Sequence, residues 1–208
     1  GGETVRKLAA SLPGMGPADV VYPPSFEGKW RVERLTAGVE SPSGFPPVQG
    51  RGQAVAGQTI SYDARYVRKG DQVIADREFN LKNLVLAAEG QNVGVVWVWS
   101  NPNALSMSYP DGRIRDIKVT KRAASIGKDG STVEFSEFRR EAALGFAGSA
   151  RGLVGVPDIS ASWIRAKYRQ VDRNTVEGIV LEYDLPSASQ DPSTATSKVK
   201  YRVSMTRL

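Results

Sequence analysis

The stretch Phe26-Glu27-Gly28-Lys29-Trp30 decides the fold. It follows the stiff turn Tyr22-Pro23-Pro24-Ser25 and opens the first alternating segment, Lys29 to Glu40. A Gly-x-Trp at the start of a first strand, ahead of a long series of strand-like segments, is typical of closed antiparallel barrels. The tryptophan fills one end of such a barrel, and glycine lets the backbone pass close beneath the ring. The stretch therefore predicts a barrel with Trp30 at one end.

Apolar and polar residues alternate along most of the later segments, as in strands with one buried face. The last segment shows this most clearly, with an expected inward row of Val199, Tyr201, Val203 and Met205. An antiparallel up-and-down barrel of about 8–10 strands explains the pattern, and its last strand would pair with its first. Arg202 or Arg207 would then stack on Trp30. The expected strands are 29–40, 58–68, 72–79, 93–100, 104–109, 113–123, 132–141, 158–170, 175–185 and 198–208.

The chain is expected to form one β-barrel domain, residues 25–208, preceded by a lead-in segment, residues 1–24. Asn80 is expected to cap a short helix over residues 81–88 that covers one end of the barrel. The strand 93–100 carries tryptophans on one face and valines on the other. Both of its faces are therefore expected to be covered, either within the chain or by a partner.

The composition narrows the chemistry, because the chain has no cysteine and no histidine. This excludes disulfides, thiol nucleophiles, Ser-His-Asp triads and zinc sites of the usual kind. Catalysis would have to rest on carboxylates, lysine, tyrosine or serine. We therefore expect a protein that is not an enzyme and that holds no metal and no cofactor.

The charge balance favours anionic partners, since the chain has 28 basic and 22 acidic residues and therefore a net charge of +6. The sequence shows no basic-aromatic signature of nucleic-acid binding, so we expect no nucleic acid. It also has no run of ~18–20 apolar residues, so we expect no membrane span. Charges spread singly along strands are equally typical of a solvated barrel surface. The chain opens with Gly-Gly-Glu, which we interpret as a mature form that has lost a targeting segment.

Two groups of residues are candidates for partner binding. The first surrounds the glycine-rich segment 144–155 and comprises Arg139, Arg140 and Arg151. The second lies on one register of the strand 158–170 and comprises Trp163, Arg165 and Lys167. A large aromatic beside cations suits an interface anchor. The alternatives are a solvated turn for the first group and a Trp163 covered by the N-terminal segment for the second.

Two other functions remain open at this stage. A barrel of this kind can carry a small lipophilic ligand, pigment or lipid, provided that large inward side chains leave its interior empty. The expected inward residues are Tyr62, Tyr66, Trp97, Tyr168, Tyr201 and Met205. An enzyme acting through carboxylates is the third possibility, with Asp63, Asp76 and Glu78 as the candidate group.

Several stretches resemble a known family. The opening Tyr22-Pro23-Pro24-Ser25-Phe26-Glu27-Gly28-Lys29-Trp30 resembles the lipocalin-type Gly-x-Trp start and, more narrowly, that of a group of plant, algal and cyanobacterial thylakoid proteins. The stretches 73–80, 101–103 and 136–138 are similar to the same group, and the similarity spans most of the chain from Tyr22 onward. These stretches are structural rather than catalytic.

The resemblance implies a calycin-like barrel in the chloroplast thylakoid lumen. It further implies an accessory role with a membrane protein complex, photosystem II core subunits above all, in assembly or repair. The basic charge of this chain departs from the acidic character common among lumenal proteins. In that location, arginine and lysine would meet acidic surfaces of membrane subunits, where electrostatics sets steering and register.

Overall fold

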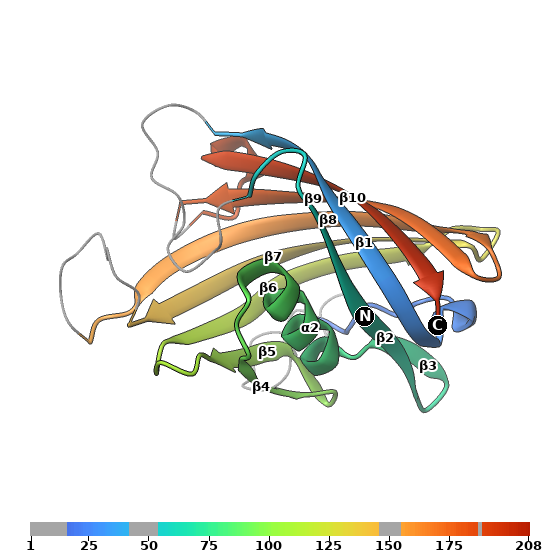
Figure 1. Ribbon diagram of the computed structural model, residues 1–208, viewed down its shortest axis with the longest axis horizontal. Helices are drawn as coiled ribbons and strands as arrows, with labels where there is room; N and C mark the ends of the chain where they lie inside the picture. The colour runs from blue at the N-terminus through green and yellow to red at the C-terminus, as the bar shows by residue number, and fades with distance from the viewer. Residues whose placement is uncertain (1–15, 42–53, 146–154, 187–188) are drawn as a thin grey trace, which may run out of the picture.

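The computed structural model describes residues 16–41, 54–145, 155–186 and 189–208. Within these ranges, the chain forms an antiparallel all-β sheet of ten strands, curled into a half-barrel with one short helix (Figure 1). This confirms the predicted fold class. The strands are β1 (Gly28–Glu40), β2 (Thr59–Lys69), β3 (Gln72–Ala75), β4 (Gly94–Val98), β5 (Asn101–Ser108), β6 (Ile114–Ile126), β7 (Thr132–Leu144), β8 (Asp158–Asp172), β9 (Thr175–Leu185) and β10 (Ser197–Arg207).

The strands form an antiparallel meander in which the first strand, β1, and the last strand, β10, are neighbours. From β4 to β10 each strand pairs with the next, and β10 then pairs with β1, with Trp30 opposite Arg207. The last strand thus pairs with the first, as the sequence predicts. The sheet itself ends at β3 on one side and β4 on the other. Helix α2 (Arg77–Glu89) packs against β2 and β4 and lies across this opening (Figure 1).

Helix α2 begins earlier than the sequence indicated. Asp76 caps it, because its carboxylate accepts a hydrogen bond from the Phe79 backbone N–H at 3.0 Å. The predicted strand 72–79 therefore stops at Ala75, and the prediction that Asn80 is the cap was wrong. Asn80 instead joins the helix to β2, where its side chain accepts from the Arg65 N–H at 2.7 Å and donates to the Arg65 carbonyl at 3.2 Å.

Trp30 fills one end of the half-barrel. Its side chain is fully buried, and its Nε1 donates to the Phe26 carbonyl of the 3₁₀ turn η1 (Pro24–Phe26) at 2.8 Å. The Arg207 guanidinium lies over the ring at 4.2 Å and donates to the carbonyls of Glu27 and Ser25. Gly28 makes this approach possible, because its φ is +128° and an added Cβ would lie 3.0 Å from Arg207 Nη1.

Arg202 does not take part at this end of the sheet. It lies opposite Leu35 on the outer face, because Arg207 and the odd-numbered residues before it on β10 face inward. Val203 and Met205 belong to the main inner core, which is completed by Val20, Tyr22, Phe26, Trp30, Val32, Ala64, Tyr66, Val73, Val133 and Val176. Tyr22 of the expected lead-in segment is thus part of the core.

Strand β4 is covered on its inner face only. Trp97 packs inward on a second small core around Met107, whereas Val96, Val98 and Trp99 are 72%, 53% and 56% exposed. Of the two alternatives for this strand, cover of both faces by the chain itself does not hold within the described residues, and cover by a partner stays a prediction. The physical reason is its place at the end of the sheet, where α2 packs from one side.

Candidate functional site

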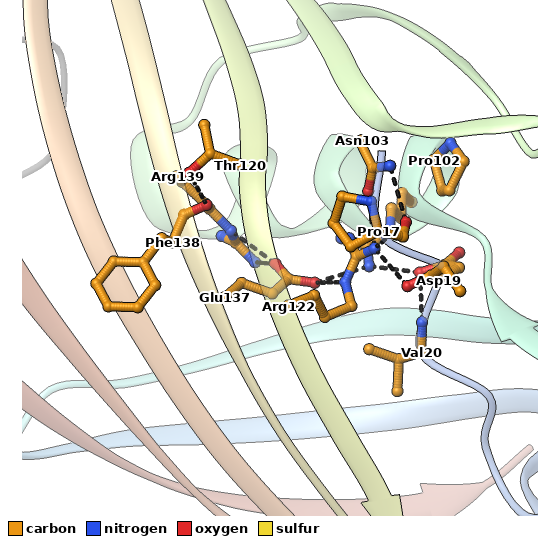
Figure 2. Close-up of polar contacts among 12 residues, drawn as sticks. Pro17, Asp19, Val20, Pro102, Asn103, Thr120, Arg122, Glu137, Phe138 and Arg139 are labelled. Carbon is orange, nitrogen blue, oxygen red and sulfur yellow. Dashed lines mark hydrogen bonds and ion pairs between the residues drawn. The ribbon is translucent and has the colours of Figure 1, made fainter. Parts of the chain in front are cut away.

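The predicted docking residues are divided between the two faces of the sheet. Successive residues of a strand point to opposite faces, so on β7 Glu137 and Arg139 face inward while Phe138 and Arg140 face outward. Figure 2 shows the Phe138 ring pointing away from the Glu137 carboxylate. The two adjacent arginines therefore cannot act together at one docking element.

An aromatic row crosses the outer face. Phe138 of β7 lies opposite Trp163 of β8, and Trp163 lies opposite Tyr183 of β9. The row continues to lysine at both ends, with Lys121 opposite Phe138 and Lys198 opposite Tyr183. We call these five residues, together with Arg165, the outer row. They span five neighbouring strands, from β6 to β10.

The outer row combines ring stacking with cation–π contacts. The Phe138 and Trp163 ring centroids are 5.8 Å apart at an interplanar angle of 21°, and those of Trp163 and Tyr183 are 5.1 Å apart at 38°. Arg165 lies over Trp163 at 5.4 Å, Lys198 over Tyr183 at 5.7 Å and Lys121 over Phe138 at 6.0 Å. All three rings are half-buried. The cations thus lie over the rings at about the outer limit of a favourable contact, ~6 Å.

The structure places the predicted docking residues as follows. Trp163 and Arg165 are in the outer row, and Arg140 is exposed on the same face, opposite Ala161. Lys167 lies further along β8 and forms an ion pair with Glu134 at 2.9 Å. Arg139 faces inward, where its side chain contacts Glu137 at 2.6 Å. Arg151, and residues 1–15 that were the alternative cover for Trp163, lie outside the described residues.

Sequence reasoning missed four members of the outer row: Lys121, Phe138, Tyr183 and Lys198. Each occupies the outward register of its own strand, which alternation alone can suggest. What the sequence does not contain is the register between strands that makes them neighbours. A bulge between Val119 and Lys121 also shifts β6 by one residue, so simple alternation along that strand fails.

A buried charge cluster occupies the inner face (Figure 2). The Glu137 side chain is fully buried and receives ion pairs from Arg77 at 3.0 Å, Arg122 at 2.9 Å and Arg139 at 2.6 Å. Arg77 also pairs with Asp19 at 2.7 Å. We call these five residues the inner cluster. It joins the segment before β1, helix α2 and strands β6 and β7.

The inner cluster also forms hydrogen bonds to the segment before β1 and to Asn103 of β5. Arg122 Nη1 donates to the Ala18 carbonyl at 2.8 Å and to the Asn103 side-chain oxygen at 2.7 Å. Asn103 in turn donates to the Pro17 carbonyl at 2.9 Å. Gly16 approaches so closely that an added Cβ would lie 2.3 Å from the Asn103 amide nitrogen. The segment 16–20 is therefore held against the sheet by polar contacts.

The ionisation of Glu137 follows from its neighbours. Burial alone would raise the pKa of this carboxyl, but the charges of Arg77, Arg139 and Arg122 outweigh it and hold the pKa well below its usual range. Glu137 is therefore a carboxylate at neutral pH, and its charge is compensated inside the sheet.

A cavity of about 260 Å³ lies beside the inner cluster, between α2 and the inner face. Arg77 and Arg139, which both contact Glu137, are its charged lining residues, and we call the part of the wall that they form its polar end. The remaining wall is mostly apolar and aromatic, and of the large residues predicted to face inward it includes Tyr62, Tyr66, Tyr168 and Met205. These side chains line the interior and leave part of it open, so the half-barrel keeps the space that a ligand would need.

The three carboxylates considered for catalysis have separate roles. Asp63 pairs with Arg31 at 2.6 Å, Asp76 caps α2 and pairs with Arg65 at 2.7 Å, and Glu78 pairs with Lys82 at 2.9 Å. Among the described residues, no group of three acidic side chains is arranged to hold a metal ion. Each of the three carboxylates is thus paired with a cation of its own.

The comparisons with known proteins identify the family. The described part of the chain contains no helix of the length and apolarity that crossing a bilayer requires. No curated protein matches the sequence. Residues 14–208, which include every strand of the half-barrel, match a family model, so the chain belongs to the family described as Domain of unknown function (DUF6816).

Proposed function

We propose that this protein is a non-catalytic docking factor that binds an acidic surface of a photosynthetic membrane complex through its outer row. The complex proposed is photosystem II, in assembly or repair, and the compartment is the thylakoid lumen. The observation that carries the docking role is the row itself, in which three stacked aromatic rings each have a cation above them. The identity of the partner rests on the resemblance of the stretch 22–30.

The composition of the outer row suits an interface. Tyrosine, tryptophan, phenylalanine and arginine are enriched at the centres of protein–protein interfaces, where large rings supply contact area at little entropic cost. The row itself contains no acidic residue, and Arg140 adds a further exposed cation on the same face. A partner rich in carboxylates would be steered toward this face and oriented on it.

Salt sensitivity distinguishes this mode of docking from apolar association. Exposed charges interact over a Debye length of about 8–10 Å at physiological ionic strength and over much less at high salt. Binding through the outer row should therefore weaken as salt is raised, because its three cations contribute to both attraction and register. Binding through the exposed apolar residues of β4 would instead persist at high salt.

The test is an affinity pull-down from detergent-solubilised thylakoids, washed at low and then at high salt. We expect photosystem II core subunits to be recovered at low salt and lost at high salt. The triple variant Lys121→Glu, Arg165→Glu and Lys198→Glu should recover none at either salt concentration. The matched control reverses the same amount of charge elsewhere, with Arg68→Glu, Lys82→Glu and Lys128→Glu, and should behave like the unaltered protein.

Two results would count against the proposal. Equal losses in the two triple variants would show that net charge, and not the outer row, determines recovery. Recovery of no membrane subunit by the unaltered protein would contradict the docking function itself. Circular dichroism of each variant verifies that the sheet is intact before the comparison is made.

A further inference from the structure

We infer that the cavity between α2 and the inner face binds a small amphiphilic carboxylate, with its head at Arg77 and Arg139 and its apolar part against the aromatic wall. This inference is independent of docking, because it concerns the opposite face of the sheet. It assigns a chemical class of ligand to the interior.

The charge of the inner cluster is not balanced by its own acids. Arg77, Arg122 and Arg139 carry three positive charges, and Asp19 and Glu137 carry two negative ones, which leaves +1. Both Arg77 and Arg139 line the cavity, whereas neither acid does. The polar end of the cavity is therefore cationic, and one monoanion would neutralise the cluster. Placing a single anion there offsets the cost of holding an excess charge away from water.

The two arginines that line the cavity keep accessible surface. The Arg77 side chain is 18% exposed, whereas that of Arg122, which does not line the cavity, is 2% exposed. The Arg139 side chain is 31% exposed although it contacts Glu137 through two of its nitrogens. Guanidinium groups present planar donors that fit a carboxylate. Two such groups at one end of a cavity are suited to an acid head rather than to an alcohol or an amine.

The tyrosines of the wall add no charge of their own. Burial raises the pKa of Tyr66 well above its ordinary value, and burial also raises that of Tyr168. Both phenols therefore remain neutral over the physiological range. An anionic head is thus attracted by the two arginines without opposition from the wall, and the rings offer flat surfaces to an alkyl or cyclic tail.

The size of the cavity limits the ligand. A volume of about 260 Å³ lies just below the range of about 300–1,000 Å³ that is usual for small-molecule pockets. This is small for a phospholipid with its headgroup and suits a carboxylate with a single alkyl chain. Asn80, Leu81 and Leu84 of α2 form part of the wall. A bound molecule would therefore contact the helix that covers the opening of the half-barrel.

Titration calorimetry on the full chain tests the inference with three probes of equal chain length: decanoate, decan-1-ol and decylamine. We expect decanoate to bind roughly 10- to 100-fold more tightly than decan-1-ol, because hydrogen bonds to a charged group distinguish them. Decylamine should bind most weakly. A decanoate-dependent rise in the unfolding temperature should accompany binding, since a ligand of the folded state stabilises it by mass action.

Two arginine variants locate the site. Arg139→Gln leaves Glu137 paired with Arg77 and Arg122 and should lower the affinity for decanoate by roughly tenfold or more while leaving that for decan-1-ol little changed. Arg165→Gln is the matched control on the outer face and should leave decanoate binding unchanged. A third variant, Ala75→Leu, places extra volume in the cavity wall and should weaken all probes alike.

The outcomes are decisive in both directions. Equal affinities for decanoate and decan-1-ol would overturn the assignment of a carboxylate head, and no binding of any probe would overturn the ligand site. Decanoate binding that survives both Arg139→Gln and Ala75→Leu would place the ligand elsewhere. Failure of the docking experiment leaves these measurements unaffected, because Arg165→Gln alters the outer row and Arg139→Gln the inner cluster.

Discussion

The two faces of the sheet use arginine in opposite ways. On the inner face, Arg122 is almost fully buried, with 2% of its side chain exposed, and contacts a buried carboxylate at 2.9 Å. On the outer face, Arg165 is exposed and lies over an indole ring at 5.4 Å. The same side chain is a structural partner in one place and a surface cation in the other. Burial, and not residue type, decides which charges stabilise the fold and which are available to a partner.

The physical basis of the difference is desolvation. Removing one partner from a buried group of charges leaves the others uncompensated in a medium of low dielectric, which is strongly destabilising. An exposed ion pair or cation–π contact is solvated before and after the change, so its loss has a small effect on stability. Substitutions of charged residues on the inner face should therefore lower the free energy of unfolding far more than substitutions on the outer face.

The largest effect is expected for Glu137→Gln. The substitution keeps the shape of the side chain but leaves Arg77, Arg122 and Arg139 without their shared anion. We expect a loss of about 3–5 kcal/mol in the free energy of unfolding, measured by urea denaturation.

Glu134→Gln is the matched control for this prediction. It makes the same change on the same strand but on the outer face, where Glu134 is 51% exposed and pairs with Lys167. The expected loss is no more than about 1 kcal/mol. Similar losses for the two variants would contradict the division between faces.

Low pH should destabilise the protein because it protonates Glu137 of the inner cluster. The pKa of Glu137 is lower in the folded state than in the unfolded chain, so its contribution to stability is complete above the unfolded value of about 4.3. That contribution is lost as the pH falls below this value toward the folded pKa. We expect the unaltered protein to lose stability steeply below about pH 4 and Glu137→Gln to show a flatter dependence in the same range. Urea denaturation at a series of pH values measures both slopes, and parallel slopes would exclude Glu137 as the group responsible.

The positions of most strands and the burial of Trp30 at one end of the barrel could be predicted from the sequence. Local alternation places most strands correctly, and the Gly-x-Trp stretch predicts a buried Trp30, which the structure shows beneath Arg207. Both depend on residues that are close in sequence. The start of α2 was misplaced because Asp76 and Asn80 are both good capping residues, and only the packing of Asn80 on β2 decides between them.

The candidate sites were predictable only in part, because they depend on contacts between distant segments. The inner cluster brings Asp19, Arg77 and Glu137 together from three separate elements, and no local pattern links them. Trp163 and Arg165 were found from alternation within one strand, whereas Phe138 and Tyr183 require the register between strands. Arg139 and Arg140 were grouped because they are adjacent, although adjacency on a strand places them on opposite faces.

An intermediate effect is expected for Trp163→Ala. The ring is half-buried and stacked between Phe138 and Tyr183, so its removal loses contact area without opening the main core. We expect a loss of about 1–2 kcal/mol in the free energy of unfolding, less than the roughly 3–5 kcal/mol for truncation of a fully buried aromatic side chain. Docking to the membrane complex should fall far more than stability does. A loss of stability as large as that of Glu137→Gln would show that the row is a structural element.

The smallest effect is expected for Arg140→Gln, and it is the sharpest test of the comparison because the altered residue adjoins Arg139. Arg140 is exposed on the outer face, whereas Arg139 contacts Glu137 at 2.6 Å on the inner face. We expect Arg140→Gln to change the free energy of unfolding by no more than about 0.5 kcal/mol, as exposed substitutions usually do. Its effect should lie in docking, where one fewer cation lowers the salt dependence of binding. A pair of variants at adjacent positions, one affecting decanoate binding and the other affecting only docking, would establish that the two faces of a single strand serve two different ligands.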